Sequence, residues 1–242
     1  MQVCAVIPAR YGSTRFPGKP LALIHNKPLL QWVIEGVRSA QCLDHLIVAT
    51  DDSRIESLCQ DLEVDVVMTD SDLPSGSDRV WAAVKNINCD VVVNVQGDEP
   101  LITAELIDQL VAPFQKDAGL EMATLAESLK PEDAQNSNVV KLILNKESEA
   151  IYFSRFNIPY SKNSDLLGAN LKHIGLYAYK KEFLKHFCNQ KPVAIEKMES
   201  LEQLRALYMG ARIKVISVQQ FLKGVDTPED AKQVEKILSS RS

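Results

Sequence analysis

The chain has 242 residues, of which 45% are hydrophobic and 24% are charged, and its formal net charge is −5. These values are ordinary for a globular protein and argue against disorder. Because the net charge is negative, non-specific binding to nucleic acid or to an anionic membrane is not expected. An anionic substrate would therefore need a local cluster of Lys and Arg.

The cysteines and the apolar runs indicate the compartment. Five cysteines are widely spread and form no CxxC pair, namely Cys4, Cys42, Cys59, Cys89 and Cys188. Their odd number and mostly apolar surroundings favour reduced, buried thiols. No apolar run approaches the roughly 20 residues that span a bilayer, and the first residues do not resemble a signal peptide. We therefore expect a cytoplasmic protein.

In the first half of the chain, short apolar runs alternate with helical patterns. Strands are predicted at 3–7, 46–49, 64–68 and 91–95. Helices are predicted to begin at Pro28, near Ser53 as an N-cap, after the loop at 74–77, and at Thr103 as an N-cap. This order predicts an α/β, Rossmann-like fold, with a mostly parallel sheet and helices on both faces. Ligands bind such sheets at the carboxyl ends of the strands, where polar residues follow each of the four runs.

The second half is less regular. Strands are predicted at 139–144, 150–153, 171–179 and 213–218, and an exposed loop at 157–170. Helices are predicted at about 180–188 and 195–209, and a terminal helix begins at Thr227 with Pro228 in its first turn. We expect a single domain over 1–242 with an inserted smaller sheet region at about 125–212.

The loop at 8–20 carries three cations, Arg10, Arg15 and Lys19, directly after the first strand. Gly12 and Gly18 allow tight turns and a close approach of backbone to a ligand. A triphosphate requires this combination of small residues, backbone N–H groups and fixed positive charge. The loop matches neither GxxxxGK[ST] nor GxGxxG, which disfavours a hydride-transfer enzyme. The alternative is an ordinary solvated loop.

Two aspartates stand at positions suited to a metal. Asp98 follows the fourth strand, and Asp226 directly precedes the terminal helix. Mg²⁺ is typically held by one or two carboxylates together with phosphate oxygens and water. The alternatives are a turn residue for Asp98 and a helix cap for Asp226. Glu99 is a weaker candidate and is expected to be structural.

The histidines and the nucleophile patterns exclude other chemistries. His25, His45, His173 and His186 do not pair at metal-ligand spacing, so zinc is not expected. No G-x-S-x-G or Cys/His arrangement predicts a covalent nucleophile. His173 is a candidate sugar ligand, with a structural role as the alternative.

Taken together, these motifs closely resemble the 3-deoxy-manno-octulosonate (Kdo) cytidylyltransferases, the CMP-Kdo synthetases of lipopolysaccharide biosynthesis. The matching segments run along nearly the whole chain and include IPARYGSTRFPGKPL at 7–21, IVATDD at 47–52, SGSDR at 75–79, VVNVQGDEPLI at 92–102, NVVK at 138–141, YFSR at 152–155, HIGLYAY at 173–179, ESLEQLRAL at 199–207 and GVDTPED at 224–230. The resemblance implies the nucleotide-diphospho-sugar transferase fold. It also implies that the region at about 125–212 binds sugar and forms a homodimer.

The resemblance assigns a role to each matching residue. The catalytic residues would be Arg10, Arg15, Lys19 and Asp98. The nucleotide would lie against Pro8, Ala9, Arg10, Ser75, Gly76 and Arg79. The sugar acid would lie against Gln96, Arg155, His173, Tyr177, Glu202 and Gln203. Asp98 and Asp226 would ligate Mg²⁺.

The implied substrates are CTP and an acidic octulosonate sugar. The sugar hydroxyl would attack the α-phosphorus in line, without a covalent enzyme intermediate. One departure affects the choice of sugar, because the loop between Arg155 and His173 is short and residues 159–163 lack the usual pattern. The 8-amino-3,8-dideoxy analogue of Kdo is therefore an alternative substrate. Further alternatives are a cytidylyltransferase for sialic acid or a polyol phosphate, and a non-catalytic nucleotide-binding regulator.

Overall fold

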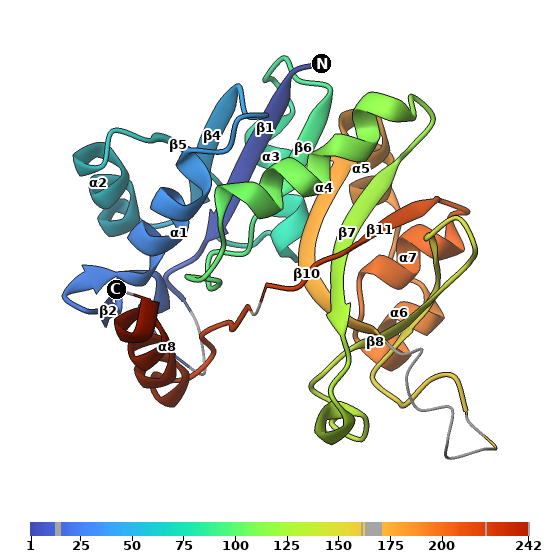
Figure 1. Ribbon diagram of the computed structural model, residues 1–242. Coiled ribbons are helices and arrows are strands. Elements are labelled where there is room, and N and C mark those ends of the chain that lie inside the picture. Colours follow the sequence, from blue (N-terminus) through green and yellow to red (C-terminus); the bar gives the residue numbers. More distant parts are fainter. Residues whose placement is uncertain (13–15, 161, 163–170, 221, 242) are drawn as a thin grey trace.

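The computed structural model describes residues 1–12, 16–160, 162, 171–220 and 222–241 (Figure 1). Within these residues nine strands form one sheet, namely β1 (Val3–Ala9), β4 (His45–Thr50), β5 (Asp65–Met68), β6 (Val91–Asn94), β7 (Met122–Ser128), β8 (Lys141–Leu144), β9 (Ala150–Ser154), β10 (Leu171–Lys180) and β11 (Ile213–Ser217). Seven of them follow the order β11-β7-β10-β6-β1-β4-β5, while β8 pairs with β10 and β9 pairs with β8.

The sheet is mixed, with a parallel part and an antiparallel part. β1 pairs in parallel with β4 and β6, β4 with β5, and β7 with β11. β10 runs antiparallel to β6, β7 and β8. The mostly parallel sheet predicted for the first half is confirmed. β7 was not among the predicted strands, and it lies beside β10 along most of its length (Figure 1).

Helices cover both faces, as predicted. They are α1 (Leu29–Arg38), α2 (Ser53–Asp61), α3 (Gly76–Val84), α4 (Ala104–Lys116), α5 (Lys181–Asn189), α6 (Ala194–Glu199), α7 (Gln203–Tyr208) and α8 (Pro228–Arg241). Short 3₁₀ turns lie at η1 (Lys19–Leu21) and η2 (Pro131–Asp133), and a small hairpin is made of β2 (Leu23–Ile24) and β3 (Lys27–Pro28). None of the described helices is long and apolar enough to cross a membrane.

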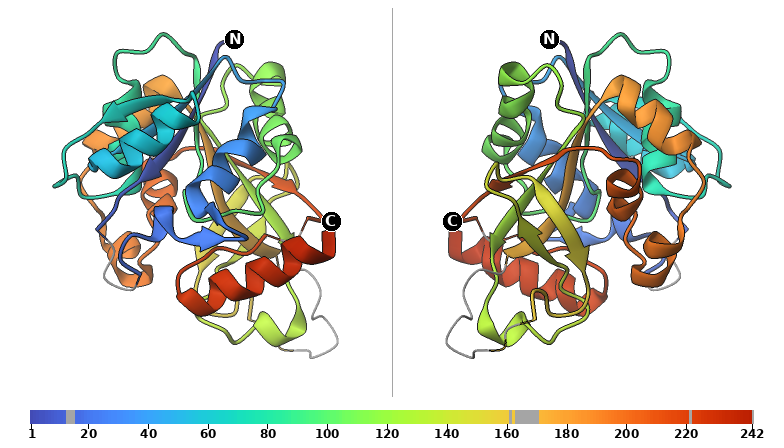
Figure 2. Two further views of the ribbon diagram at one scale, coloured as in Figure 1. Left: turned by 90° about the vertical axis from the view of Figure 1, so that its left-hand side faces the viewer. Right: turned by 90° about the vertical axis from the view of Figure 1, so that its right-hand side faces the viewer.

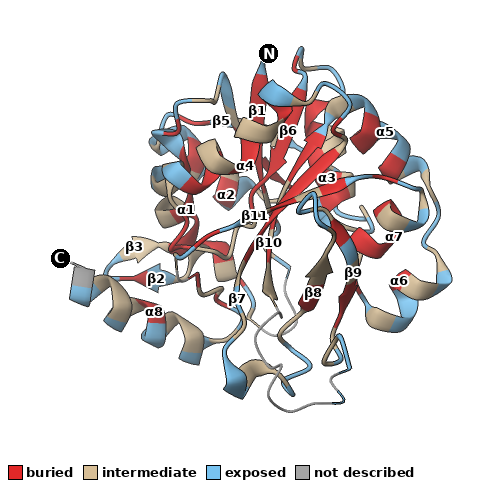
Figure 3. Ribbon diagram, turned by 45° about the vertical axis from the view of Figure 1, so that its right-hand side comes forward, coloured by how far each residue is buried: buried red, intermediate tan, exposed pale blue. Residues whose placement is uncertain are grey.

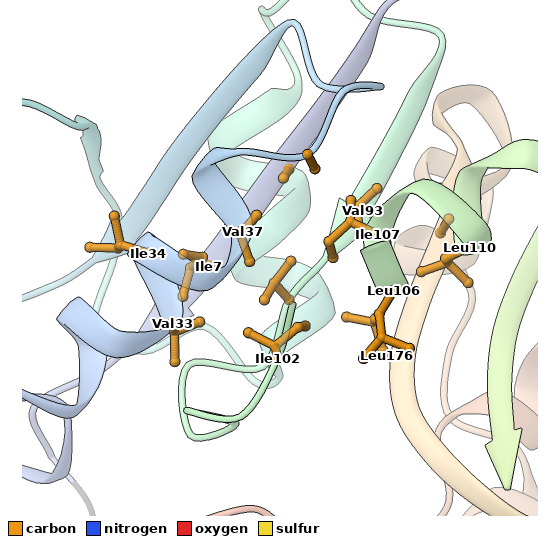
Figure 4. Close-up of a cluster of buried hydrophobic side chains, with 14 of the residues drawn as sticks. Ile7, Val33, Ile34, Val37, Val93, Ile102, Leu106, Ile107, Leu110 and Leu176 are labelled. Atoms are coloured by element: carbon orange, nitrogen blue, oxygen red, sulfur yellow. The ribbon is translucent and has the colours of Figure 1, made fainter. Parts of the chain in front are cut away.

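The alternation of side chains along β1 creates two hydrophobic clusters, one on each face. Ala5 and Ile7 face a cluster that includes residues of α1, α2, α4 and α8. Cys4 and Val6 face the other cluster, which includes residues of α3, α5 and α7. Figure 4 shows part of the first cluster, where side chains of α1 and α4 meet those of the sheet. Buried residues follow the central strands from end to end (Figure 3).

Three predicted helix caps or boundaries differ in detail from the structure. Asp52 rather than Ser53 is the N-cap of α2, and its carboxylate accepts a hydrogen bond from the backbone N–H of Arg54 at 2.9 Å. Thr103 is the N-cap residue of α4 as predicted, but its hydroxyl donates to Gln220 and makes no cap hydrogen bond. The helix predicted at 195–209 is two helices, because Ser200 adopts a left-handed conformation with φ 53° and ends α6.

α8 returns to the amino-terminal half of the molecule. It packs against β2, and Figure 2 shows it lying beside this hairpin. The backbone N–H of His25 in the hairpin donates a hydrogen bond to Glu235 Oε1 of α8 at 2.9 Å. The docking of α8 places the segment just before it, which contains Asp226, near the loop that follows β1.

Candidate active site

A cleft of about 350 Å³ opens where β1 and β6 end. Its walls come from the loop after β1, the segment before α3, the turn after β6 and the residue before α8. It is lined by Pro8, Ala9, Arg10, Lys19, Pro20, Leu73, Pro74, Ser75, Gly76, Arg79, Gln96, Gly97, Asp98 and Asp226. All six residues predicted to contact the nucleotide line this cleft. Arg15 lies outside the described residues.

Lys19 brings the two predicted metal ligands together. Its Nζ lies 2.6 Å from Asp98 Oδ2 and 3.4 Å from Asp226 Oδ1. The backbone supports this arrangement, because the N–H of Val225 donates to the carbonyl oxygen of Asp98 at 2.8 Å. Two carboxylates that are distant in sequence therefore converge on one cation position. Thr227, not Asp226, caps α8 by hydrogen bonding with Asp230, so the cap alternative for Asp226 is wrong.

The convergence of Asp98 and Asp226 shows whether these residues could hold a divalent cation. Two carboxylates facing a common positive charge fit the hard oxygen ligands that Mg²⁺ takes. The described residues contain no group of three or more His, Cys, Asp and Glu side chains that would hold a metal alone. An ion here would thus depend on oxygens of the bound substrate to complete its coordination.

Glycines shape the cleft where the chain segments approach closely. Gly18 precedes η1 with φ +70°, and a Cβ there would lie 3.0 Å from the Tyr11 hydroxyl oxygen. A Cβ on Gly97 would lie 2.9 Å from the carbonyl oxygen of Pro8. Both positions favour glycine, one for its backbone conformation and one for the close approach of two strand ends. Gly97 belongs to the QGDEP turn but was not among the predicted site residues.

Arg79 is buried and fixed within the protein. Its guanidinium contacts Asp51 Oδ2 at 3.0 Å and the Thr69 hydroxyl. Because those partners follow β4 and β5, Arg79 joins the ends of two strands at the cleft wall. Beside it, the Ser75 hydroxyl accepts from the backbone N–H of Asp78 at 3.2 Å and so caps α3.

Glu99 lies behind the two aspartates. Burial raises the pKa of Glu99 to about 8, and the nearby negative charge of Asp98 adds to this rise. One of its carboxylate oxygens is buried and has no hydrogen-bond partner among the described residues. The other would lie 3.0 Å from a Cβ on Gly224. Glu99 therefore packs beneath the site, in agreement with its predicted structural role.

Of the residues predicted to contact the sugar, only Gln96 lines the cleft. His173 and Tyr177 lie on β10, with ring centroids 5.4 Å apart, and Phe153 packs edge-on to His173 at 5.0 Å. Burial lowers the pKa of His173 to about 3. Glu202 accepts a hydrogen bond from the Ser77 hydroxyl at 2.6 Å, and Gln203 beside it is buried.

The guanidinium of Arg155 is hydrogen-bonded to backbone carbonyl oxygens. Its Nε donates to the carbonyl oxygen of Glu199 at 2.8 Å and its Nη1 to that of Ser137 at 3.1 Å. The carbonyl of Arg155 in turn accepts from the fully buried Lys141 at 2.5 Å. Lys141 was not predicted as a site residue, although it lies in the NVVK segment that carries the family resemblance. The role of Arg155 as a partner for a sugar carboxylate stays a prediction.

A cleft at the carboxyl ends of parallel strands, with cations and paired carboxylates on its walls, defines the chain as a nucleotide-binding α/β protein. The model of the cytidylyltransferase family matches residues 4–213. The chain belongs to this family, and within it to the 3-deoxy-manno-octulosonate cytidylyltransferases.

Known relatives and solved structures support the assignment of the chain to this family. The 3-deoxy-manno-octulosonate cytidylyltransferase of Bdellovibrio bacteriovorus is 54% identical, over 100% of this chain and 99% of that protein. The enzyme of that name from Thermodesulfovibrio yellowstonii is 43% identical over the full length of both chains. A structure of CMP:2-keto-3-deoxy-manno-octonic acid synthetase complexed with CTP superposes with a TM-score of 0.96, at 36% identity and full coverage of both chains. The predicted fold and family are confirmed.

Proposed function

We propose that this chain transfers the cytidylyl group of CTP to Kdo and releases pyrophosphate. The observation that carries this proposal is the contact of Lys19 with both Asp98 and Asp226, inside the cleft that the six nucleotide-side residues line. The names of the full-length relatives, and the CTP in the similar synthetase structure, support it.

In the proposed reaction, the oxygen of the C2 hydroxyl of the sugar forms a bond to the α-phosphorus of CTP and loses its proton to water. The bond from that phosphorus to the departing pyrophosphate breaks. Arg10 and Lys19 on the cleft walls would stabilise negative charge on the triphosphate and on the leaving group. Arg15 would join them. Mg²⁺, held by Asp98 and Asp226, would neutralise phosphate charge and lower the pKa of the attacking hydroxyl.

The remaining parts of the proposal concern the sugar, the assembly and the compartment. Gln96, Arg155, His173, Tyr177, Glu202 and Gln203 would contact the sugar acid. The region at about 125–212 would bind the sugar and form a homodimer, and the protein would act in the cytoplasm.

The test is pyrophosphate release from CTP with Mg²⁺ and a panel of acceptors. Turnover with Kdo supports the proposal. A preference for its 8-amino analogue would change the assigned sugar and leave the assigned reaction unchanged. Turnover with N-acetylneuraminate but neither octulosonate would contradict it. CTP binding without any product under saturating Mg²⁺ would instead favour the regulator.

A matched variant tests the phosphate-binding role of the loop. Arg10→Ala removes a fixed positive charge from the cleft wall, so we expect a weaker affinity for CTP and a lower turnover, each by about tenfold. Lys146→Ala is the control, because this lysine is 90% exposed. Unchanged CTP affinity and rate in Arg10→Ala would show that this loop does not hold the phosphates.

A further inference from the structure

Thr124 occupies an unusual place in the sheet. It lies in the middle of β7, is fully buried, and faces a bulge in β10 where the register shifts between Ile174 and Tyr177. Its hydroxyl oxygen is 2.8 Å from the carbonyl oxygen of Leu176, 3.2 Å from that of Ile174 and 3.0 Å from His173 Nε2. A single hydroxyl therefore meets two backbone acceptors and one imidazole nitrogen.

The single proton of the Thr124 hydroxyl can be donated either to the carbonyl oxygens or to His173, but not to both. A hydroxyl carries one donor proton and two acceptor lone pairs. Carbonyl oxygens only accept, so if the proton pointed to His173, two carbonyls would face a hydroxyl oxygen with no proton between them. A buried acceptor without a donor costs about 1–3 kcal/mol. The proton thus goes to the bulge, mainly to Leu176, and the oxygen accepts from Nε2–H of His173.

We infer that Thr124 is a positioning residue that holds His173 as the Nε2–H tautomer and presents its Nδ1 as a hydrogen-bond acceptor. Since a neutral imidazole has one donor and one acceptor nitrogen, fixing one nitrogen fixes the other. Nδ1 makes no hydrogen bond to any residue that the structure describes. The chemical class it selects is a hydrogen-bond donor, such as a hydroxyl of a polyhydroxylated sugar acid, whereas a carbonyl oxygen, which only accepts, would find no partner.

The surroundings of His173 keep it neutral and in place. Phe153 packs edge-on against one side of the ring and Tyr177 lies tilted on another. Burial lowers the pKa of His173 to about 3, so the imidazolium, which would donate from both nitrogens, is not populated near pH 7. Only the nature of the donor rests on the proposed function, because the tautomer follows from the protein alone.

The tautomer can be measured by NMR in the unmodified protein. The full chain with ¹⁵N-labelled histidine gives long-range ¹H–¹⁵N spectra in which the two tautomers and the imidazolium have distinct patterns. The chain has four histidines, and His173→Gln identifies the signals of interest by their loss. We expect a neutral Nε2–H ring at pH 7. A neutral Nδ1–H ring or an imidazolium at that pH would overturn the inference.

Two variants of Thr124 test whether its contact with His173 affects substrate binding. Thr124→Ser keeps the hydroxyl, and Thr124→Val removes it at nearly constant shape. In the Val variant we expect mixed tautomers and a KM for the octulosonate about tenfold higher, as for one lost hydrogen bond, with the KM for CTP changed less than about twofold. Thr124→Ser should restore both the spectrum and the KM.

The outcomes separate this inference from the proposed function. A wild-type spectrum and KM in Thr124→Val would overturn the positioning role. An Nε2–H ring in a chain without cytidylyl transfer would leave the tautomer assignment standing and contradict only the proposed reaction. If Thr124→Val does not fold, the spectrum of the unmodified protein still decides the tautomer.

Discussion

At the scale of single residues, the charge of Asp98 tests the proposed metal site. It lies 2.6 Å from Lys19 Nζ and shares that cation with Asp226. Asp98→Asn keeps the shape but removes the charge, so it should weaken the proposed binding of Mg²⁺, which would act mainly in the transition state. We expect kcat to fall about 100-fold or more, while CTP affinity changes less than about threefold. Pyrophosphate release and calorimetry measure the two quantities.

The exposed Asp61 at the end of α2 provides the control for this charge change. Asp61→Asn should retain the wild-type kcat. If Asp98→Asn also retained near-normal turnover, the metal-binding role of Asp98 would be refuted.

His173 makes stability depend on pH. Its pKa falls from 6.5 to about 3 in the folded state because the ring is buried. Between these values the unfolded chain binds a proton that the folded chain rejects, so the free energy of unfolding decreases as the pH falls. Between pH 7 and pH 5 the loss amounts to about 2 kcal/mol.

Urea unfolding at both pH values measures this effect. The difference between wild type and His173→Gln should shrink by about 2 kcal/mol on going from pH 7 to pH 5. The exposed His186→Gln gives the matched control, since it should follow the wild-type pH dependence. A pH-independent difference for His173→Gln would contradict a neutral His173 with a lowered pKa.

At the scale of elements, α1 approaches the chain before α4 so closely that only glycine fits at Gly36. A Cβ there would lie 2.3 Å from the carbonyl oxygen of Ile102. Alanine would favour the helix by about 1 kcal/mol, but the clash is with backbone and forces the two segments apart. We expect Gly36→Ala to lower the free energy of unfolding by about 3 kcal/mol.

Chemical denaturation measures the free energy of unfolding of Gly36→Ala, and Gly175→Ala in β10 is the control. No atom lies within 4 Å of a Cβ at Gly175. This variant should therefore stay within about 1 kcal/mol of wild type. Equal effects of the two substitutions would show that Gly36 is not selected by its contact with Ile102.

The individual elements also show which parts of the fold and of the site the sequence could predict. The strands β1, β4 and β6 were predictable because each is a short run of buried apolar residues. The break at Ser200 was not, because a left-handed serine carries no local signal in a helical pattern. In the site, Lys19, Asp98 and Asp226 could be proposed from their places beside strands or a helix. The backbone bonds of Arg155 and the burial of Lys141 depend on segments that meet only in the fold.

At the scale of the whole molecule, exposed apolar side chains are unevenly distributed. Eight large hydrophobic residues are exposed in the described part of the chain. Five of them lie between 151 and 208, namely Ile151, Phe156, Tyr160, Met198 and Tyr208. They belong to the part of the molecule formed by β8, β9, α6 and α7, away from β4 and β5 (Figure 1). Large exposed apolar side chains gathered in one region are typical of an interface.

This distribution supports the proposed homodimer and makes it testable. Met198 is 85% exposed and Tyr208 66% exposed, so replacing both with Glu should not disturb the fold but would place charges in an interface. We expect the wild-type chain to sediment as a dimer at micromolar concentration, and Met198→Glu/Tyr208→Glu to sediment as a monomer with unchanged circular dichroism. Leu23→Glu, at a residue 62% exposed in the distant β2, should stay dimeric. A monomeric wild type, or a dimer that survives the double change, would exclude this region as the interface.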